Sequence, residues 1–480
     1  MSRSARLVPW LAAVIPLIFF LYFFRLTGTG LFDPDEPRYA SIGREMAQSG
    51  DWITPRLWGN PWFEKSPWLY WMVGAGFRLG LHDELAPRLP VALLSVAFLA
   101  FFYWSLRREF GAQPALLSTI ILGTSAGWLA YSYKAVTDLP MSVFFSAAML
   151  TGMAWLRTGA KRTLIVAAAL LGVAVLAKGF VPLVLAIPFA WVARRRMREI
   201  LRFWPIFTFL IVAAPWYLLC WARNGPVFWQ QIFWEQQVGR FTSAALQHVQ
   251  PVWFYLPVFA ALLFPWTPAA ALLFRRSQYS DERRILLLLW LAFGLIFFSV
   301  PMNKLPGYVL PLLPPAAALM GLAVAESNAR WVAPASAAML CLIGPLGSML
   351  AQLLAGGLSR SHMPQWNFTW LLPLALVPLV WRAPRPIAVF LVGAGLTAGV
   401  VYVKLASFPA IDAAYSARPL WREIAAVRDR VCVEEIPRNW RYGLNYYSVT
   451  PLPDCNQTSR PVRVTQPSGG VPVVSPAISP

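Results

Sequence analysis

Apolar segments long enough to cross a membrane recur along this chain from residue 8 to residue 405. Of its 480 residues, 58% are hydrophobic and only 13% are charged. A soluble domain has no use for so many long apolar segments, so the pattern predicts a polytopic, all-α membrane protein. The four cysteines are scattered and fit no metal-binding spacing such as CxxC.

We predict thirteen transmembrane segments from these apolar runs. They are residues 8–24, 86–105, 114–131, 139–156, 163–177, 180–193, 203–221, 252–273, 285–301, 305–324, 332–354, 368–381 and 387–405. Several are shorter than the roughly 20 residues that a perpendicular helix needs, which is tolerated where helices break inside a bundle. The first is expected to be an uncleaved helix, because no small-residue cleavage site follows it.

The basic residues set the expected orientation of these segments. With the N-terminus in the cytoplasm, every cytoplasmic loop contains Arg or Lys, and these loops are 107–113, 157–162, 194–202, 275–284, 326–330 and 382–386. This is the positive-inside pattern, and it accounts for much of the net charge of +20. The positive charge therefore indicates membrane topology and not a nucleic-acid partner.

The first external loop, residues 25–85, contains the densest cluster of opposite charges in the chain. Its stretch "DPDEPRYASIGREMAQSG" predicts a short amphipathic helix on the membrane surface, with Asp35 as N-cap and Gly50 at the C-terminal stop. Tyr39 lies on the apolar face of this helix. Two interpretations stay open. Either Asp35 only caps the helix while Arg38 pairs with Glu36, or these charges take part in chemistry.

Two further features of this loop bear on its function. Glu64 and Lys65 lie between aromatic residues, which suits either a surface salt bridge of small energy or a site that holds a phosphate near the lipid boundary. Residues 67–81 are apolar but are expected to form an interfacial helix, because a crossing there would put every basic loop outside. Ionisable residues at the edge of a membrane bundle indicate a functional site.

The stretch "DPDEPRYASIGREMAQSGDWITPRLWGNPWFEKSPWLYW" resembles the first external loop of bacterial GT-C-type glycosyltransferases. That family includes the aminoarabinose transferases that act on lipid A and the protein O-mannosyltransferases. Four later stretches resemble further motifs of the family, in order: "YSYKAVTDLPM", "LAKGFVPLVLAIP", "RFTSAALQHVQPVWFYLPVFAALLFPWTP" and "NKLPGYVLPLLPPAAALMG". The resemblance covers residues 8 to 325 and implies sugar transfer from a polyprenyl-phosphate carrier at the outer face.

The resemblance also implies roles for individual residues. Asp35 and Asp138 would be catalytic and lie on either side of the reacting centre. The phosphate and the rest of the donor would be bound by Arg38, Tyr39, Lys65, Lys178, Lys304 and Tyr308. Glu64 and His248 would bind a divalent metal, with zinc as the candidate, although zinc normally takes more than two protein ligands.

Elementary chemistry agrees with these roles. Cleavage of a sugar–phosphate bond develops charge on the leaving phosphate, which fixed cations in a pocket of low dielectric stabilise. Arg suits phosphate oxygens as a fork and Lys as a point charge. A hydroxyl acceptor would need an Asp as general base, whereas a phosphate acceptor would not. The motif "FEKSP" departs from the family's usual "FEKP", and the tail is shorter than the soluble domain of the aminoarabinose enzymes.

Residues 1–405 are predicted to form the transmembrane glycosyltransferase domain, and residues 406–480 a small external α/β module. In the module we expect a helix at 419–430 and strands at 430–435, 443–449 and 462–466. Cys432 and Cys455 are placed to pair if the compartment is oxidising. The last dozen residues are expected to be disordered.

The sequence thus predicts an enzyme that moves a monosaccharide from undecaprenyl-type phosphate to a lipid acceptor, such as lipid A or a lipid-linked glycan. Its expected location is a bacterial inner membrane, with a cytoplasmic N-terminus and a periplasmic C-terminal module. One alternative is protein glycosylation of the O-mannosyltransferase kind. Another is a transporter or flippase for a lipid-linked substrate, which the absence of an internal sequence repeat disfavours. The transferred sugar and the oligomeric state are not predicted.

Overall fold

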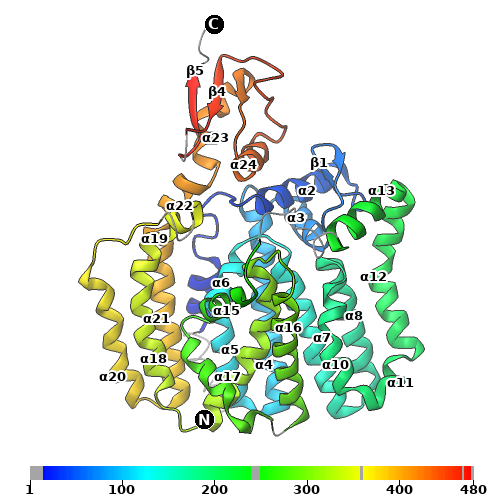
Figure 1. The fold of residues 1–480 in the computed structure, drawn as a ribbon, viewed down its shortest axis with the longest axis vertical. Coiled ribbons are helices and arrows are strands. Elements are labelled where there is room, and N and C mark those ends of the chain that lie inside the picture. The colour runs from blue at the N-terminus through cyan, green and yellow to red at the C-terminus, as the bar shows by residue number, and fades with distance from the viewer. Residues whose placement is uncertain (1–13, 239–248, 280, 357–360, 468–469, 477–480) are drawn as a thin grey trace.

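The computed structural model describes residues 14–238, 249–279, 281–356, 361–467 and 470–476. Its largest part is a bundle of helices that run along the long axis of the molecule, with a small module at one end (Figure 1). Among the described helices, six are long and apolar enough to cross a membrane, or eight if each of two bent pairs is one span. Among the described residues, helical structure occurs in every predicted range, but the count of thirteen crossings stays a prediction.

The long helices pack in layers, and their burial differs. Those that satisfy the length and composition criterion are α4 (Leu85–Phe110), α7 (Asp138–Thr158), α12 (Phe203–Asn224), η7–α17 (Pro306–Leu312, Leu313–Glu326), α18–η8–α19 (Val332–Met339, Leu340–Leu342, Ile343–Gly356) and α21 (Arg385–Ala406). The most apolar windows of α7 and α17 are 83% and 89% buried, whereas that of α18–α19 is 22% buried. The first two therefore form the core of the bundle, and the last lies at its rim.

Shorter or more polar helices complete the bundle. They are η1 (Phe19–Phe23), α8 (Lys161–Lys178), α9 (Val181–Leu185), α10 (Ile187–Val192), α16 (Glu282–Ser299), η10 (Phe368–Ala375) and α20 (Leu376–Arg382). Two of the short ones, α9 and α10, follow directly on α8 and together fill one predicted segment. Short helices of this kind are tolerated in a membrane bundle because neighbouring helices shield their ends.

Two predicted spans are broken in the middle, and the breaks meet. One span consists of α5 (Ala112–Gly123) and α6 (Ala126–Tyr133), bent by 57°. The other consists of η4–α15 (Val252–Phe254, Tyr255–Leu262) and η5 (Thr267–Phe274), bent by 118°. The Ala126 N–H donates to the Phe264 carbonyl at 2.8 Å, and the Trp266 indole donates to Thr124 Oγ1 at 2.8 Å. Each break thereby satisfies polar groups of the other, as a helix break inside an apolar bundle requires.

The six loops predicted to be cytoplasmic are linked to one another at the end away from the module, where η2 (Arg194–Arg196), α11 (Met197–Ile200) and η6 (Arg276–Tyr279) also lie (Figure 1). The links are Arg157 and Arg283 to Glu109, Arg284 to Glu326, Arg385 to Asn328, and Arg196 to the Leu156 carbonyl. A shared end agrees with the predicted topology. Which side of the membrane this end faces stays a prediction.

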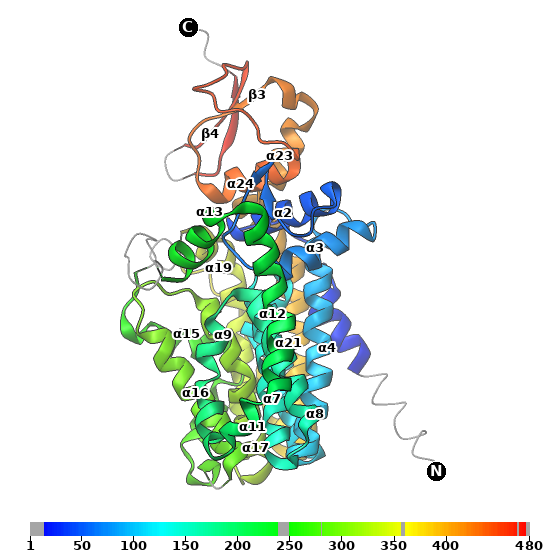
Figure 2. The ribbon, with the colours of Figure 1, turned by 90° about the vertical axis from the view of Figure 1, so that its right-hand side faces the viewer.

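At the module end lie α2 (Asp35–Ser49), the hairpin β1–β2 (Arg56–Leu57, Asn60–Pro61), α3 (Trp68–Arg78), α13 (Pro226–Trp229) and η3 (Gln230–Val238) (Figures 1 and 2). The predicted surface helix is confirmed as α2, and it ends at Gly50, whose φ of 74° suits a residue without a side chain. The prediction that Asp35 is the N-cap is wrong. Pro34 holds that position, and Asp35 is the first helical residue.

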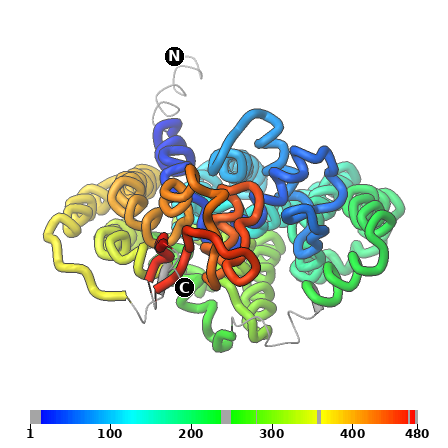
Figure 3. Tube along the Cα trace, turned by 90° about the horizontal axis from the view of Figure 1, so that it is seen from above, coloured from blue at the N-terminus to red at the C-terminus, as the bar shows by residue number. Residues whose placement is uncertain are grey.

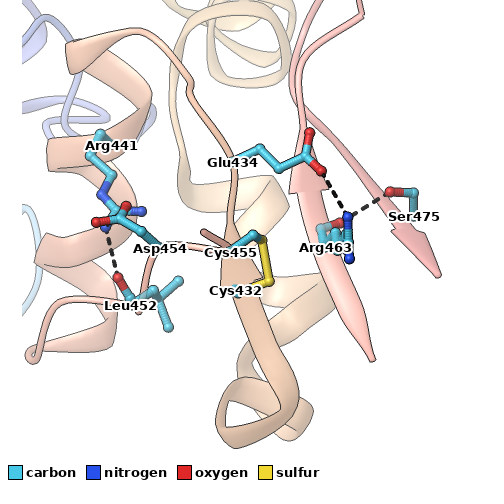
Figure 4. Close-up of a disulfide and its surroundings, with 8 residues drawn as sticks. All are labelled: Cys432, Glu434, Arg441, Leu452, Asp454, Cys455, Arg463 and Ser475. Atoms are coloured by element: carbon cyan, nitrogen blue, oxygen red, sulfur yellow. Dashed lines mark hydrogen bonds and ion pairs between the residues drawn. A yellow bond between two sulfur atoms is a disulfide. The ribbon is translucent and has the colours of Figure 1, made fainter. Parts of the chain in front are cut away.

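The C-terminal module consists of α22 (Phe408–Tyr415), α23 (Arg418–Ile424), η11 (Ala425–Arg430), β3 (Val431–Val433), α24 (Arg438–Ser448), β4 (Val462–Thr465) and β5 (Val473–Pro476). Strand β4 pairs with β3 in parallel and with β5 in antiparallel orientation. The predicted pairing of Cys432 with Cys455 is confirmed, and the disulfide ties β3 to the loop that precedes β4 (Figure 4).

Two predictions for the module are wrong. Residues 443–448 belong to α24 and do not form a strand, because Trp440, Leu444 and Tyr447 are spaced to share one helical face, which packs on the module's core. The expectation of a disordered end fails at β5, which pairs with β4 along four residues. The neighbouring strand supplies the backbone partners that these residues lack by themselves.

Candidate active site

A first group of charges lies between α2 and the segment that leads to α3. Arg38 Nη2 is 2.5 Å from Asp35 Oδ1 and 3.0 Å from Glu64 Oε2, and Lys65 Nζ is 3.3 Å from Glu64 Oε1. The side chains of Arg38, Glu64 and Lys65 are only 10–11% exposed, whereas that of Asp35 is 37% exposed. The interpretation of Glu64–Lys65 as a surface salt bridge is therefore wrong, and so is the pairing of Arg38 with Glu36.

Aromatic rings enclose the Arg38 guanidinium. Its Cζ lies 5.3 Å from the ring centroid of Tyr39, 5.7 Å from that of Trp62 and 5.4 Å from that of Tyr442. Burial acts to lower the pKa of Arg38, but its negative neighbours, among them Glu64, outweigh this effect and raise the pKa above its ordinary value. Tyr442 belongs to α24, so the C-terminal module contributes directly to the first group.

Several buried donors around Arg38 have no hydrogen-bond partner in the part of the chain that the structure describes. They are Arg38 Nε, the hydroxyls of Tyr39 and Tyr70, and the indole N–H groups of Trp58, Trp62 and Trp68. Burial raises the pKa of Tyr39 and of Tyr70, so both hydroxyls keep their protons. Buried donors are usually paired, and a set of unpaired donors beside an arginine suits an anionic, oxygen-rich ligand.

A second group of charges forms where α7, α8 and η7 meet. Lys178, the last residue of α8, places its Nζ 2.5 Å from Asp138 Oδ1 and 4.7 Å from the ring centroid of Tyr308. A Cβ added to Gly307 would lie 2.7 Å from both Asp138 Oδ1 and the Tyr131 hydroxyl, so only glycine allows this close approach. Three stretches that the sequence analysis singled out separately are thus brought together.

Lys304 lies in the loop before η7 and is buried. Its Nζ donates to the carbonyls of Gln250 at 2.9 Å and of Pro301 at 2.6 Å. In this arrangement Lys304 ties the loop before η7 to the loop before η4. Its predicted role in phosphate binding stays a prediction.

The pair that joins the two groups to the bundle was missed by the sequence analysis. Arg88 and Glu36 are both fully buried and form a two-pronged ion pair at 2.9 and 2.8 Å. Glu36 also accepts the backbone N–H of Ala135 at 3.0 Å, and Arg88 donates to the Thr29 carbonyl at 2.7 Å. The pair therefore fixes the loop before α2 and the loop before Asp138 to α4. An arginine in the first turn of a predicted span was the signal that could have revealed it.

An apolar cavity of about 480 Å³ lies beside these groups. Its polar lining includes Tyr131, Tyr133 and Lys134, and Lys134 pairs with Asp33. Its deeper lining is aliphatic and comes from the rim of the bundle, with Leu346, Leu350, Leu354, Leu396, Val400 and Val403. A cavity lined by both polar and aliphatic side chains suits a lipid with a polar head.

The predicted metal site receives no support from the described residues. His248 lies outside them, and within them no group of three His, Cys, Asp or Glu side chains is placed to bind a metal. Glu64 is already held by Arg38 and Lys65. The described residues therefore do not fit a zinc site.

The arrangement of the helices is that of the GT-C glycosyltransferases. The structure is similar to that of ArnT from Cupriavidus metallidurans bound to undecaprenyl phosphate, with a TM-score of 0.76 at 24% sequence identity over 92% of this chain and 85% of that one. It is also similar to the oligosaccharyltransferase AglB from Archaeoglobus fulgidus, with a TM-score of 0.54 at 12% identity over 95% of this chain and 65% of that one.

Sequence comparisons narrow the class. Residues 64–221 match the family model described as dolichyl-phosphate-mannose-protein mannosyltransferase. An undecaprenyl phosphate-alpha-4-amino-4-deoxy-L-arabinose arabinosyl transferase of Pectobacterium carotovorum is 34% identical over 64% of this chain, a match that spans only 57% of that relative. Arabinosyl transferase 1 of Sodalis glossinidius, of the same name, is 33% identical over 82% of this chain and 71% of its own length. This chain belongs to the family of these arabinosyl transferases.

Proposed function

We propose that the protein transfers a monosaccharide from a polyprenyl-phosphate carrier to a lipid acceptor at the outer face of a bacterial inner membrane. The observation that carries the proposal is the presence of two carboxylate–cation groups, Asp35–Arg38 and Asp138–Lys178, at the module end of the bundle, with a large apolar cavity whose lining includes Tyr131 beside the second group. A polar head with a long apolar chain has the shape and chemistry for such a site. The names of the relatives support the same donor class.

The cations would hold the phosphate of the carrier. Arg38 offers a fork that two carboxylates and three rings hold rigid, and Lys65 and Lys178 offer point charges. The unpaired hydroxyls of Tyr39 and Tyr70 would add neutral donors. Donors that are fixed before the reaction stabilise the charge that develops on the leaving phosphate more than they stabilise the bound substrate.

The carboxylates would act on the acceptor and on the sugar. The bond between the anomeric carbon and the phosphate oxygen breaks, and its electron pair stays on the phosphate oxygen. The polyprenyl phosphate therefore leaves as an anion. The acceptor oxygen forms the new bond to the anomeric carbon. If the acceptor is a hydroxyl, its proton passes to a carboxylate, and we assign this role to Asp35 because it is the more exposed of the two. Asp138 would balance positive charge on the sugar.

The cavity supports a lipid acceptor over a protein. Its aliphatic lining would take acyl or prenyl chains, whereas a protein acceptor would need a polar groove. The transporter alternative has no similar support, because the relatives are named as transferases. Protein glycosylation stays the second candidate, because one matching family model is described as a protein mannosyltransferase.

Mass spectrometry of lipids and glycoproteins tests this proposal, with cells that contain the protein compared with cells that lack it. We expect a membrane lipid that is heavier by one monosaccharide only where the protein is present. A sugar that disappears from proteins while all lipids stay unchanged would contradict the lipid acceptor and favour protein glycosylation. No change in either class would contradict the transfer reaction itself.

A further inference from the structure

A polar cavity of about 320 Å³ lies apart from both charge groups, between α2, the loop after α3 and the module. Its lining is Arg44, Ala47, Gln48, Phe77, Arg78, His82, Asp83 and Tyr446. Arg44 is six residues after Arg38 on α2, which is about 9 Å along a helix axis. The 240° turn that accompanies this rise places the two arginines on different faces of the helix.

The cavity is built and held open by three separate parts of the chain. Arg44 stacks on the ring of Tyr446, with its Cζ 4.6 Å from the centroid. The Tyr446 hydroxyl donates to the Asp83 carbonyl at 2.8 Å, so the module fixes the loop that carries His82. Figure 3, viewed from the module end, shows the module lying over α2 and its neighbours. The wall of the cavity is therefore rigid before any ligand enters.

Arg44 is partly buried and Arg78 is exposed, and both lack the carboxylate partners that the buried Arg38 and Arg88 have. Neither Arg44 nor Arg78 forms an ion pair or hydrogen bond with a residue that the structure describes. Burial lowers the pKa of Arg44. By contrast, Arg38 and Arg88 are each paired with a buried carboxylate. A half-buried guanidinium without a partner is unfavourable, and a bound anion would relieve this.

The charge balance of the cavity also favours an anion. Among the residues that line the cavity, two arginines face one carboxylate, that of Asp83, so one positive charge remains. Glu45 also acts on Arg44, but its Oε1 already accepts the Gly59 N–H at 2.9 Å. The planar fork of arginine matches phosphate oxygens in two directions at once. Gln48 at the rim can donate a further hydrogen bond.

The surroundings indicate a lipid as the source of the phosphate. Arg78 ends α3, the helix that the sequence places in the membrane interface, and the next residue, Leu79, is 81% exposed. An exposed leucine beside an unpaired arginine suits the boundary where acyl chains meet headgroups. We propose that Arg44 and Arg78 form a binding site for the phosphate of a membrane-lipid headgroup, separate from the transfer site. The inference does not rest on the proposed transfer reaction.

Binding of soluble short-chain phosphatidic acid to the purified full-length protein in neutral detergent tests this site. We expect the Arg44→Gln/Arg78→Gln variant to bind it at least about tenfold more weakly, since two charge-assisted contacts are lost. The matched control is Arg56→Gln, at a partly exposed arginine of the β1–β2 hairpin at the same end, which should bind within about twofold of the parent. Unchanged binding by the double variant would overturn the proposal.

Two further measurements test whether the ligand is a lipid and whether it binds at this cavity. Inorganic phosphate should bind much more weakly than phosphatidic acid, and equal affinity would overturn the lipid assignment in favour of a free phosphate. The second measurement is hydrogen exchange of the unmutated protein with and without phosphatidic acid. It does not depend on a variant that could misfold. We expect phosphatidic acid to slow exchange in residues 76–84, and no protection there would contradict the site.

Discussion

The two polar ends of the helical bundle are both rich in ion pairs, but the pairs differ in burial. At the end away from the module, the side chains of Arg196 and Glu199 are 31% and 30% exposed, and those of Arg283 and Asp281 are 30% and 27% exposed. At the module end, Arg88 and Glu36 are 0% exposed. Exposed pairs contribute little to stability, whereas a buried pair fixes geometry and becomes costly when one partner is lost.

This difference in burial indicates that the charges at the two ends have different functions. The exposed arginines at one end suit orientation of the chain in the membrane, which depends on where the charge lies and not on its exact partner. The buried groups at the other end hold carboxylates, cations and unpaired donors in fixed positions, as a reaction centre requires. Matched substitutions at the two ends should therefore have unequal effects.

The largest effect is expected from Arg88→Gln. Loss of one partner leaves the Glu36 carboxylate buried and unpaired, which costs about 3–5 kcal/mol. We expect little folded protein, and hence no transfer, by size-exclusion chromatography and thermal melting. The control Arg196→Gln breaks the Arg196–Glu199 pair at the other end, in which both side chains are partly exposed, and should cost about 0–1 kcal/mol. Equal melting temperatures for the two variants would contradict the comparison.

Lys178→Gln should leave the protein folded and slow transfer by about 100- to 1,000-fold, because one fixed cation beside the developing charge is lost. Lys161, at the opposite end of the same helix α8, offers a matched control. Turnover by Lys161→Gln is expected to stay within about twofold of the parent protein. Similar losses in both variants would show that Lys178 acts only on the structure of α8.

Tyr442→Leu should have a smaller effect on the donor. It removes one of the rings on Arg38, a contact worth up to about 2 kcal/mol, so the KM for the carrier-linked sugar should rise by at most about 30-fold. Tyr442→Phe keeps the ring and should restore the parent KM. If the Phe variant is as impaired as the Leu variant, the hydroxyl and not the ring matters, and the proposed ring contact with Arg38 is contradicted.

The smallest effect on transfer is expected from the double substitution Cys432→Ser/Cys455→Ser. The disulfide closes a loop within the module and contributes about 2–4 kcal/mol to its stability. Contacts such as Tyr447 with Glu84 keep the module docked without it. We expect faster proteolysis of the module and transfer within about twofold of the parent. A large loss of transfer would show that the disulfide supports the site.

Features set by local pattern were predictable from the sequence. The limits of α2 followed from its apolar spacing and from Gly50, and the linked ends of the loops followed from the distribution of arginine. The separate stretches that carry Asp138, Lys178 and Tyr308 were identified through their resemblance to a family. The structure adds that the Lys178 side chain contacts both of the others.

Features set by packing between distant segments were not predictable. Nothing in the sequence near Glu36 shows that its partner is Arg88 and not Arg38, because both arginines follow it on predicted helices. Tyr442 was missed for the same reason, and the run that follows it, residues 443–449, was predicted to be a strand. Local propensity misled there because the buried face of α24 has helical spacing, and tertiary packing overrides propensity.

Transfer of labelled sugar from polyprenyl phosphate by the purified protein tests the central claim most directly, with one Asp→Asn variant at each end. Asp35 and Asp281 both pair with an arginine, but only Asp35 lies beside the cations of the proposed site. We predict that Asp35→Asn folds and loses about 100- to 10,000-fold in turnover, as expected for loss of a general base. Asp281→Asn should retain near-parent turnover. A folded Asp35→Asn variant with near-parent turnover would contradict the account.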